Sequence, residues 1–148
     1  MPSAPGMPFV RIVADTNVLV SGSLWNGAPA RILEAVEARR LTLVLSPELW
    51  AEFAAVLNRP KLASRIRSLG LAPSALAHSL RTHVEWTAPG AIKPPPGLRD
   101  PKDLPVLAAA VAGRVDAIVT GDGDLLHLGT FCGIPILAVE AMLSRIRR

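Results

Sequence analysis

Short apolar runs rich in β-branched residues alternate along the chain with longer stretches of helical periodicity. Runs of this length between turn-forming residues predict buried strands, and apolar residues spaced three and four apart predict amphipathic helices. We expect strands at residues 12–14, 41–45, 115–120 and 134–138, with helices between them. Such alternation builds a parallel sheet with helices on both faces. The sequence therefore predicts an α/β fold, a three-layer α/β/α sandwich around a central, mostly parallel sheet.

The remaining segments set the domain organisation. Helices are expected at residues 28–39, 47–58, 61–68, 73–83, 103–113, 124–128 and 139–146. Residues 21–29, rich in Gly, Ser and Asn, are expected to form a loop, and the Pro-rich stretch 89–101 a surface connector. Residues 1–9 have neither a basic segment nor a long apolar core, so they are expected to be a flexible lead-in and not a signal peptide. We expect one domain over residues 10–148.

Composition narrows the class of protein. The chain is 50% hydrophobic and 19% charged, which is typical of a globular protein. No apolar run reaches the roughly 18 residues of a membrane span. Cys132 is the only cysteine, which excludes a disulfide within the chain and a cysteine-based metal site, and a cytoplasmic location is expected. The net charge of +4 weakly favours a polyanionic partner, while the shortage of aromatic residues disfavours base stacking as its binding mode.

Acidic residues follow two of the expected strands directly. Asp15 ends the first apolar run, and Asp122 follows the strand that finishes at Thr120. Burying a carboxylate costs several kcal/mol unless it is paired or binds a cation. Because ligands of open α/β sheets bind outside the carboxyl ends of the strands, both acids are candidates for a binding crevice.

Two expected helices each carry a further acid near the sheet. Glu52 lies at the border of an apolar stripe, and Asp103 projects onto the apolar side of an Ala-rich helix. Both have simpler explanations: Glu52 fits a solvated position, and Asp103 fits an N-cap at a positive helix end. Asp100 is the other candidate for the role of Asp103.

Asp15, Glu52, Asp103 and Asp122 would form one pocket in this fold. Four close carboxylates repel one another, and hard divalent cations relieve that repulsion. An all-oxygen site favours Mg²⁺ or Mn²⁺ over zinc. Such a metal lowers the pKa of a bound water and supports its attack on phosphorus. The pattern therefore predicts hydrolysis of phosphodiester bonds by metal-activated water.

Four stretches in order carry a family resemblance: ADTNVLVSG, SPELWAEFAAVLNRPK, RDPKDLPVLAAAVAG and VDAIVTGDGDLL. Together they resemble the PIN domain family, named for the PilT N-terminus, and within it the VapC-like toxins of bacterial toxin–antitoxin systems. The resemblance implies a Mg²⁺- or Mn²⁺-dependent ribonuclease. Its catalytic residues would be Asp15, Glu52, Asp103 and Asp122, with the first, third and fourth as metal ligands. Its supporting residues would be Asn17, Thr120, Asp124 and Asp100.

The resemblance also implies partners, and it has one departure. It implies an RNA substrate, a protein antitoxin over the acidic crevice and a homodimer. The departure is that Lys102 and Leu104 stand beside Asp103, where the VapC-like group usually has more acids. Lys102 would either lower metal affinity or contact phosphate.

Two alternatives remain open. One is a PIN-fold module that binds nucleic acid or protein without catalysis. The other is a phosphoacceptor receiver domain, but that fold needs paired acids in the first loop and a late Lys. This chain has a single acid at Asp15 and no Lys after Lys102.

Overall fold

Six strands form the central sheet of the part of the chain that the computed structural model describes, residues 10–146. Residues 1–9, the predicted lead-in, lie outside the described residues. The strands are β1 (Val10–Ala14), β2 (Leu41–Leu45), β3 (Val84–Trp86), β4 (Ala117–Val119), β5 (Thr130–Phe131) and β6 (Ile134–Leu137). Their spatial order is β3-β2-β1-β4-β6-β5, and every neighbouring pair is parallel except β5 with β6. The predicted α/β architecture with a mostly parallel sheet is confirmed.

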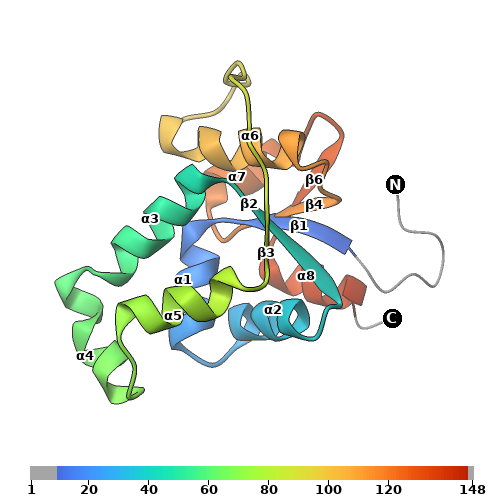
Figure 1. Ribbon diagram of the computed structural model, residues 1–148. Coiled ribbons are helices and arrows are strands. Elements are labelled where there is room, and N and C mark those ends of the chain that lie inside the picture. Colours follow the sequence, from blue (N-terminus) through green and yellow to red (C-terminus); the bar gives the residue numbers. More distant parts are fainter. Residues whose placement is uncertain (1–9, 147–148) are drawn as a thin grey trace.

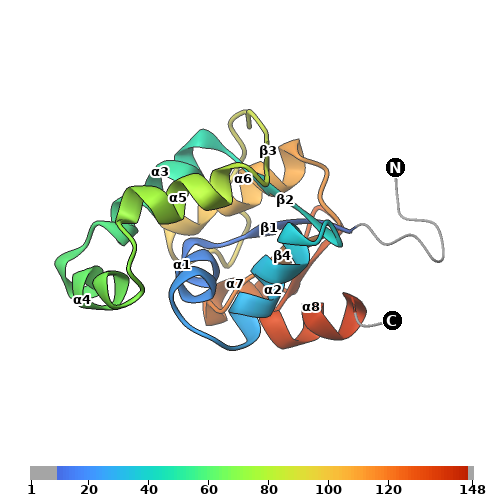
Figure 2. The same ribbon diagram turned by 60° about the horizontal axis from the view of Figure 1, so that its bottom comes forward.

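Helices cover both faces of this sheet (Figures 1 and 2). They are α1 (Thr16–Leu24), α2 (Ala28–Glu37), α3 (Pro47–Leu57), α4 (Pro60–Ser68), α5 (Pro73–Arg81), α6 (Leu104–Ala112), α7 (Gly123–Leu128) and α8 (Val139–Ile146). A 3₁₀ turn, η1 (Pro101–Asp103), precedes α6. In Figure 1, α6 covers one face of the sheet, and α1, α2 and α8 lie on the opposite side. Within residues 10–146 no helix combines the length and apolarity that crossing a bilayer requires.

The core lies on both sides of the central strands. In β1, residues Ile12, Val13 and Ala14 are completely buried, and so are Ile118 and Val119 in the neighbouring β4. Adjacent residues of a strand point to opposite faces, so burial of consecutive positions means that helices cover the sheet twice. The continuous apolar runs of the sequence therefore reflect a buried parallel sheet.

Helix α1 corrects one expectation about local structure. Residues 21–24 were expected in a loop, but they form the last turn of α1. Gly22 lies where α1 packs on α2: a Cβ at this position would come within 2.7 Å of the Pro29 carbonyl oxygen. The poor helix propensity of Gly and Ser is thus overridden by packing that needs a residue without a side chain.

The carboxyl ends of β1 and β4 lie next to each other. Ala14 is in register with Val119, and the Asp15 N–H donates to the Val119 carbonyl oxygen at 3.1 Å. The residues that follow these two strands are therefore neighbours in space, as the predicted topology requires.

Candidate active site at the carboxyl ends of the strands

Asp15 leaves β1 and becomes the N-cap of α1. Its Oδ1 accepts a hydrogen bond from the Val18 N–H at 3.0 Å, and its Oδ2 accepts one from the hydroxyl of Thr120. The residue is only 8% exposed. Burial raises the pKa of the Asp15 carboxyl, while the bonds from Thr120 and Val18 oppose that rise. The carboxylate is thus fixed in orientation by two elements of the fold.

Thr120 connects the acids that follow the two strands. Its side chain is completely buried at the end of β4. The Thr120 hydroxyl donates to Asp15, and its oxygen accepts the Asp122 N–H at 2.9 Å. The Asp122 Oδ1 in turn accepts the Asp124 N–H at 2.9 Å, which caps α7. A single hydroxyl therefore sets the position of one carboxylate relative to the backbone of another.

Asp103 reaches the same region from η1 and α6. It precedes α6, yet its side chain makes no capping hydrogen bond. Its Oδ2 is buried and has no hydrogen-bond partner within the described residues. Burial, then the adjacent Asp122 carboxyl, raise the pKa of Asp103 to about 7. Capping thus does not explain this acid; Asp100 instead caps η1, its Oδ1 accepting the Lys102 N–H at 2.9 Å.

A pocket of about 180 Å³ collects these side chains. Six of the eight predicted site residues line it: Asp15, Asn17, Glu52, Asp100, Asp103 and Asp122. The other two, Thr120 and Asp124, hold lining residues in place through the hydrogen bonds above. Asp15, Asp103 and Asp122 thus line one pocket together with the exposed Glu52 of α3.

Three further lining residues are not among the eight predicted site residues. They are Thr16, Lys102 and Val106. Thr16 is buried and stands between two predicted site residues, so its position in the motif was an available signal. Lys102 was noted as a departure from the family pattern, and the structure places it at the pocket. Val106 was interpreted only as part of the apolar stripe of α6.

The donor set of this pocket suits a hard divalent cation. All its acidic side chains offer oxygen atoms as ligands. The buried Asp103 Oδ2 has no hydrogen-bond donor among residues 10–146, and a cation could bind it in place of one. Within residues 10–146, however, no three His, Cys, Asp or Glu side chains are grouped closely enough to hold a metal ion. The residues fit Mg²⁺ or Mn²⁺ in chemical type, and binding would require the carboxylates to move closer together.

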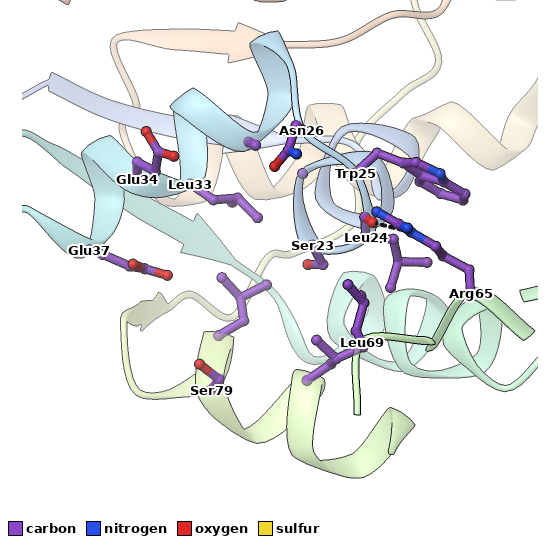
Figure 3. Close-up of a pocket in the computed structure, with 14 residues that line it drawn as sticks. Ser23, Leu24, Trp25, Asn26, Leu33, Glu34, Glu37, Arg65, Leu69 and Ser79 are labelled. Carbon is purple, nitrogen blue, oxygen red and sulfur yellow. Dashed lines mark hydrogen bonds between the residues drawn. The ribbon is translucent and has the colours of Figure 1, made fainter. Parts of the chain in front are cut away.

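A larger hollow of about 340 Å³ lies between α1–α2 and α4–α5 (Figure 3). The Arg65 Nε donates to the Leu24 carbonyl oxygen at 2.7 Å, and its guanidinium lies 5.7 Å from the centre of the Trp25 ring. Glu34 and Glu37 line the hollow together with several leucines. Two separate acids on a surface of mixed polar and apolar residues do not form a hydrolytic centre, so this hollow is not the candidate active site.

Comparison with known proteins identifies the fold family. A family model described as PIN domain matches residues 11–124. A search of curated proteins found no match. PIN domains are typically nucleases that use divalent metal ions, and the match includes every residue of the acidic pocket. The chain belongs to the PIN domain family.

Proposed function

We propose that this protein is a Mg²⁺- or Mn²⁺-dependent ribonuclease that hydrolyses phosphodiester bonds of RNA. The observation that carries the proposal is the gathering of Asp15, Glu52, Asp103 and Asp122 around one pocket at the carboxyl ends of the strands. Membership of the PIN domain family supports nuclease activity in general. The choice of RNA rests on the resemblance of the sequence motifs to the VapC-like group, and the choice of these two metals rests on the all-oxygen donors of the site.

Asp15, Asp103 and Asp122 would hold the metal ion. A bound divalent cation supplies a water of lowered pKa and stabilises negative charge on the phosphoryl oxygens. Thr120 keeps the Asp15 carboxylate oriented, and the Asp122 backbone is tied to the same hydroxyl. These bonds orient a proposed ligand, as hydrogen bonds to metal-binding carboxylates commonly do.

Glu52 has a different role in the proposal. It projects from α3 into the pocket, and its exposed carboxylate is not held by a hydrogen bond among the described residues. A mobile, solvated carboxylate suits proton transfer better than rigid ligation. We assign Glu52 as the acceptor of the proton that the attacking water loses, and Asn17, which also lines the pocket, as a residue that positions the substrate.

A pair of variants tests the assignment of the third acid. Asp103→Asn should reduce Mn²⁺-dependent RNA cleavage by about 10²-fold or more, since it removes a proposed ligand. Asp100→Asn keeps the oxygen that accepts the Lys102 N–H, so cleavage should stay within about threefold of wild type. Circular dichroism checks that both variants are folded. Full activity in Asp103→Asn together with loss in Asp100→Asn would reverse the assignment.

A second candidate function is a PIN-fold module that binds nucleic acid without cleaving it. The observation that favours it is the absence, within residues 10–146, of three acids grouped tightly enough for a metal ion. A labelled RNA separates the two functions: a binding module retains intact RNA with Mn²⁺ present, whereas a ribonuclease shortens it.

We further propose that the protein is the toxin of a bacterial toxin–antitoxin pair, acts in the cytoplasm and forms a homodimer. A protein antitoxin would then cover the active site. The hollow of Figure 3 supports a protein partner, because Trp25 is 45% exposed at its rim and Glu34 and Glu37 offer negative charge. Co-purification from the native host, followed by mass spectrometry and by sizing of the free protein, tests the partner and the dimer separately.

A further inference from the structure

Lys102 is the one cationic side chain among the residues that line the acidic pocket. The other lining residues include the acids Asp15, Glu52, Asp100, Asp103 and Asp122. A nuclease must bring a phosphodiester, itself an anion, against this group of carboxylates. Like charges repel over several ångströms, so these carboxylates oppose the approach of a phosphodiester. A positive charge at the same pocket offsets part of that repulsion.

The backbone at Lys102 is held in a fixed turn. The Asp100 Oδ1 accepts the Lys102 N–H at 2.9 Å, and the Asp100 carbonyl oxygen accepts the Asp103 N–H at 3.0 Å. The turn continues directly into α6, whose Leu107 is completely buried. The backbone of Lys102 is therefore held in place beside the pocket, unlike that of a lysine on a long flexible loop.

The ammonium group of Lys102 forms no ion pair with these acids within residues 10–146. Within residues 10–146 the ion pair found is that of Arg11 with Glu85, on other elements of the sheet. Lys102 thus lines the same pocket as these carboxylates without an ion pair to any of them, and it is exposed to solvent. A strongly hydrated, flexible ammonium of this kind binds phosphate as a point charge.

We propose that Lys102 contacts a phosphate of the bound RNA, next to the bond that is cleaved. The proposal rests on the proposed function, because it names a group of the same site that binds the substrate. It decides between two roles for this lysine. A phosphate contact strengthens RNA binding, whereas an internal counter-ion would weaken metal binding and leave RNA affinity unchanged.

The test measures RNA binding to the full chain. A fluorescent single-stranded RNA of mixed sequence is titrated with protein in Mn²⁺ at several KCl concentrations, in an Asp15→Asn background that stops cleavage. Lys102→Ala should weaken binding roughly tenfold, the loss expected for one charge-assisted hydrogen bond. It should also reduce the slope of log affinity against log salt by about 0.7, the value of one phosphate contact on a single strand.

Two control variants test whether the effect depends on the charge and on its position. Lys102→Arg keeps the charge and should restore affinity to within about threefold of the parent. Lys93→Ala removes an exposed cation of the Pro-rich connector before η1 that does not line the pocket, and it should leave affinity within about twofold. Isothermal titration with Mn²⁺ in the absence of RNA, on the chain with native Asp15, should give the same metal affinity for Lys102→Ala and for wild type.

Three results would overturn the inference in distinguishable ways. If the chain with native Asp15 cleaves RNA and Lys102→Ala leaves both affinity and salt slope unchanged, the inference fails and the ribonuclease stands. The same holds if Lys102→Ala only tightens Mn²⁺ binding, which assigns the lysine as a counter-ion. If the parent binds no RNA and the native chain cleaves none, both proposals fail.

Discussion

Replacing Asp103 by Asn should stabilise the metal-free protein at alkaline pH. Burial and the Asp122 carboxyl raise the pKa of Asp103 from 3.8 to about 7. The folded state therefore holds the proton more tightly than the unfolded state does. The charged form is penalised in the fold, so the wild type loses stability as the pH rises from about 4 through about 7.

The size of the effect follows from this rise in pKa. About three units at about 1.4 kcal/mol each set an upper bound of about 4 kcal/mol. The Asp103 side chain is partly exposed, and solvent screening reduces the effect to about 1–2 kcal/mol. In a chain of 148 residues this corresponds to a Tm difference of about 3–6 °C.

Thermal unfolding in EDTA from about pH 4.5 to about pH 8 checks the direction of this pH dependence. The Tm of Asp103→Asn minus that of wild type should grow with pH and reach its full value at the alkaline end. Asp100→Asn, which retains its bond to the Lys102 N–H, serves as the matched control and should show little pH-dependent gain. A Tm difference for Asp103→Asn that stays constant or shrinks with rising pH would contradict the claim that the charged Asp103 carboxyl destabilises the fold.

Three further predictions concern the support of the site and the helix packing. Thr120→Val removes the hydroxyl that holds Asp15 and should cost about 1–3 kcal/mol in urea unfolding, with RNA cleavage lost and Thr120→Ser retaining most of both. Gly22→Ala should destabilise by about 1–3 kcal/mol despite better helix propensity, because its Cβ would press on the Pro29 carbonyl oxygen at 2.7 Å; an unchanged or higher Tm would contradict this. Arg65→Ala should cost about 1 kcal/mol in the same urea assay and leave RNA cleavage unchanged, since it acts in the other hollow.

The convergence of the acids could be predicted because it follows from topology. In a parallel sheet, residues after neighbouring strands meet at one edge, so Asp15 and Asp122 had to be close once β1 and β4 were adjacent. The apolar period of α3 likewise placed Glu52 at the border of the buried face, and the structure puts it in the pocket.

Details that depend on side-chain direction could not be predicted. The sequence allowed Asp103 to cap α6, and only the structure shows a buried oxygen there without a partner among residues 10–146. The hydroxyl of Thr120 joins two acids through bonds that residue spacing does not specify. Helix α1 was missed because local propensity around Gly22 disfavours a helix that the packing of α2 stabilises.

The most direct test of the account is RNA cleavage by the wild-type protein and by Asp15→Asn, each with Mn²⁺, with Mg²⁺ and with EDTA. The proposed mechanism predicts that wild type cleaves RNA with either metal and that cleavage stops in EDTA. It also predicts that Asp15→Asn, folded by circular dichroism, has lost the activity. Cleavage that persists in EDTA or in Asp15→Asn, or a folded, metal-binding wild type that leaves a broad set of RNAs intact, would contradict the proposed ribonuclease.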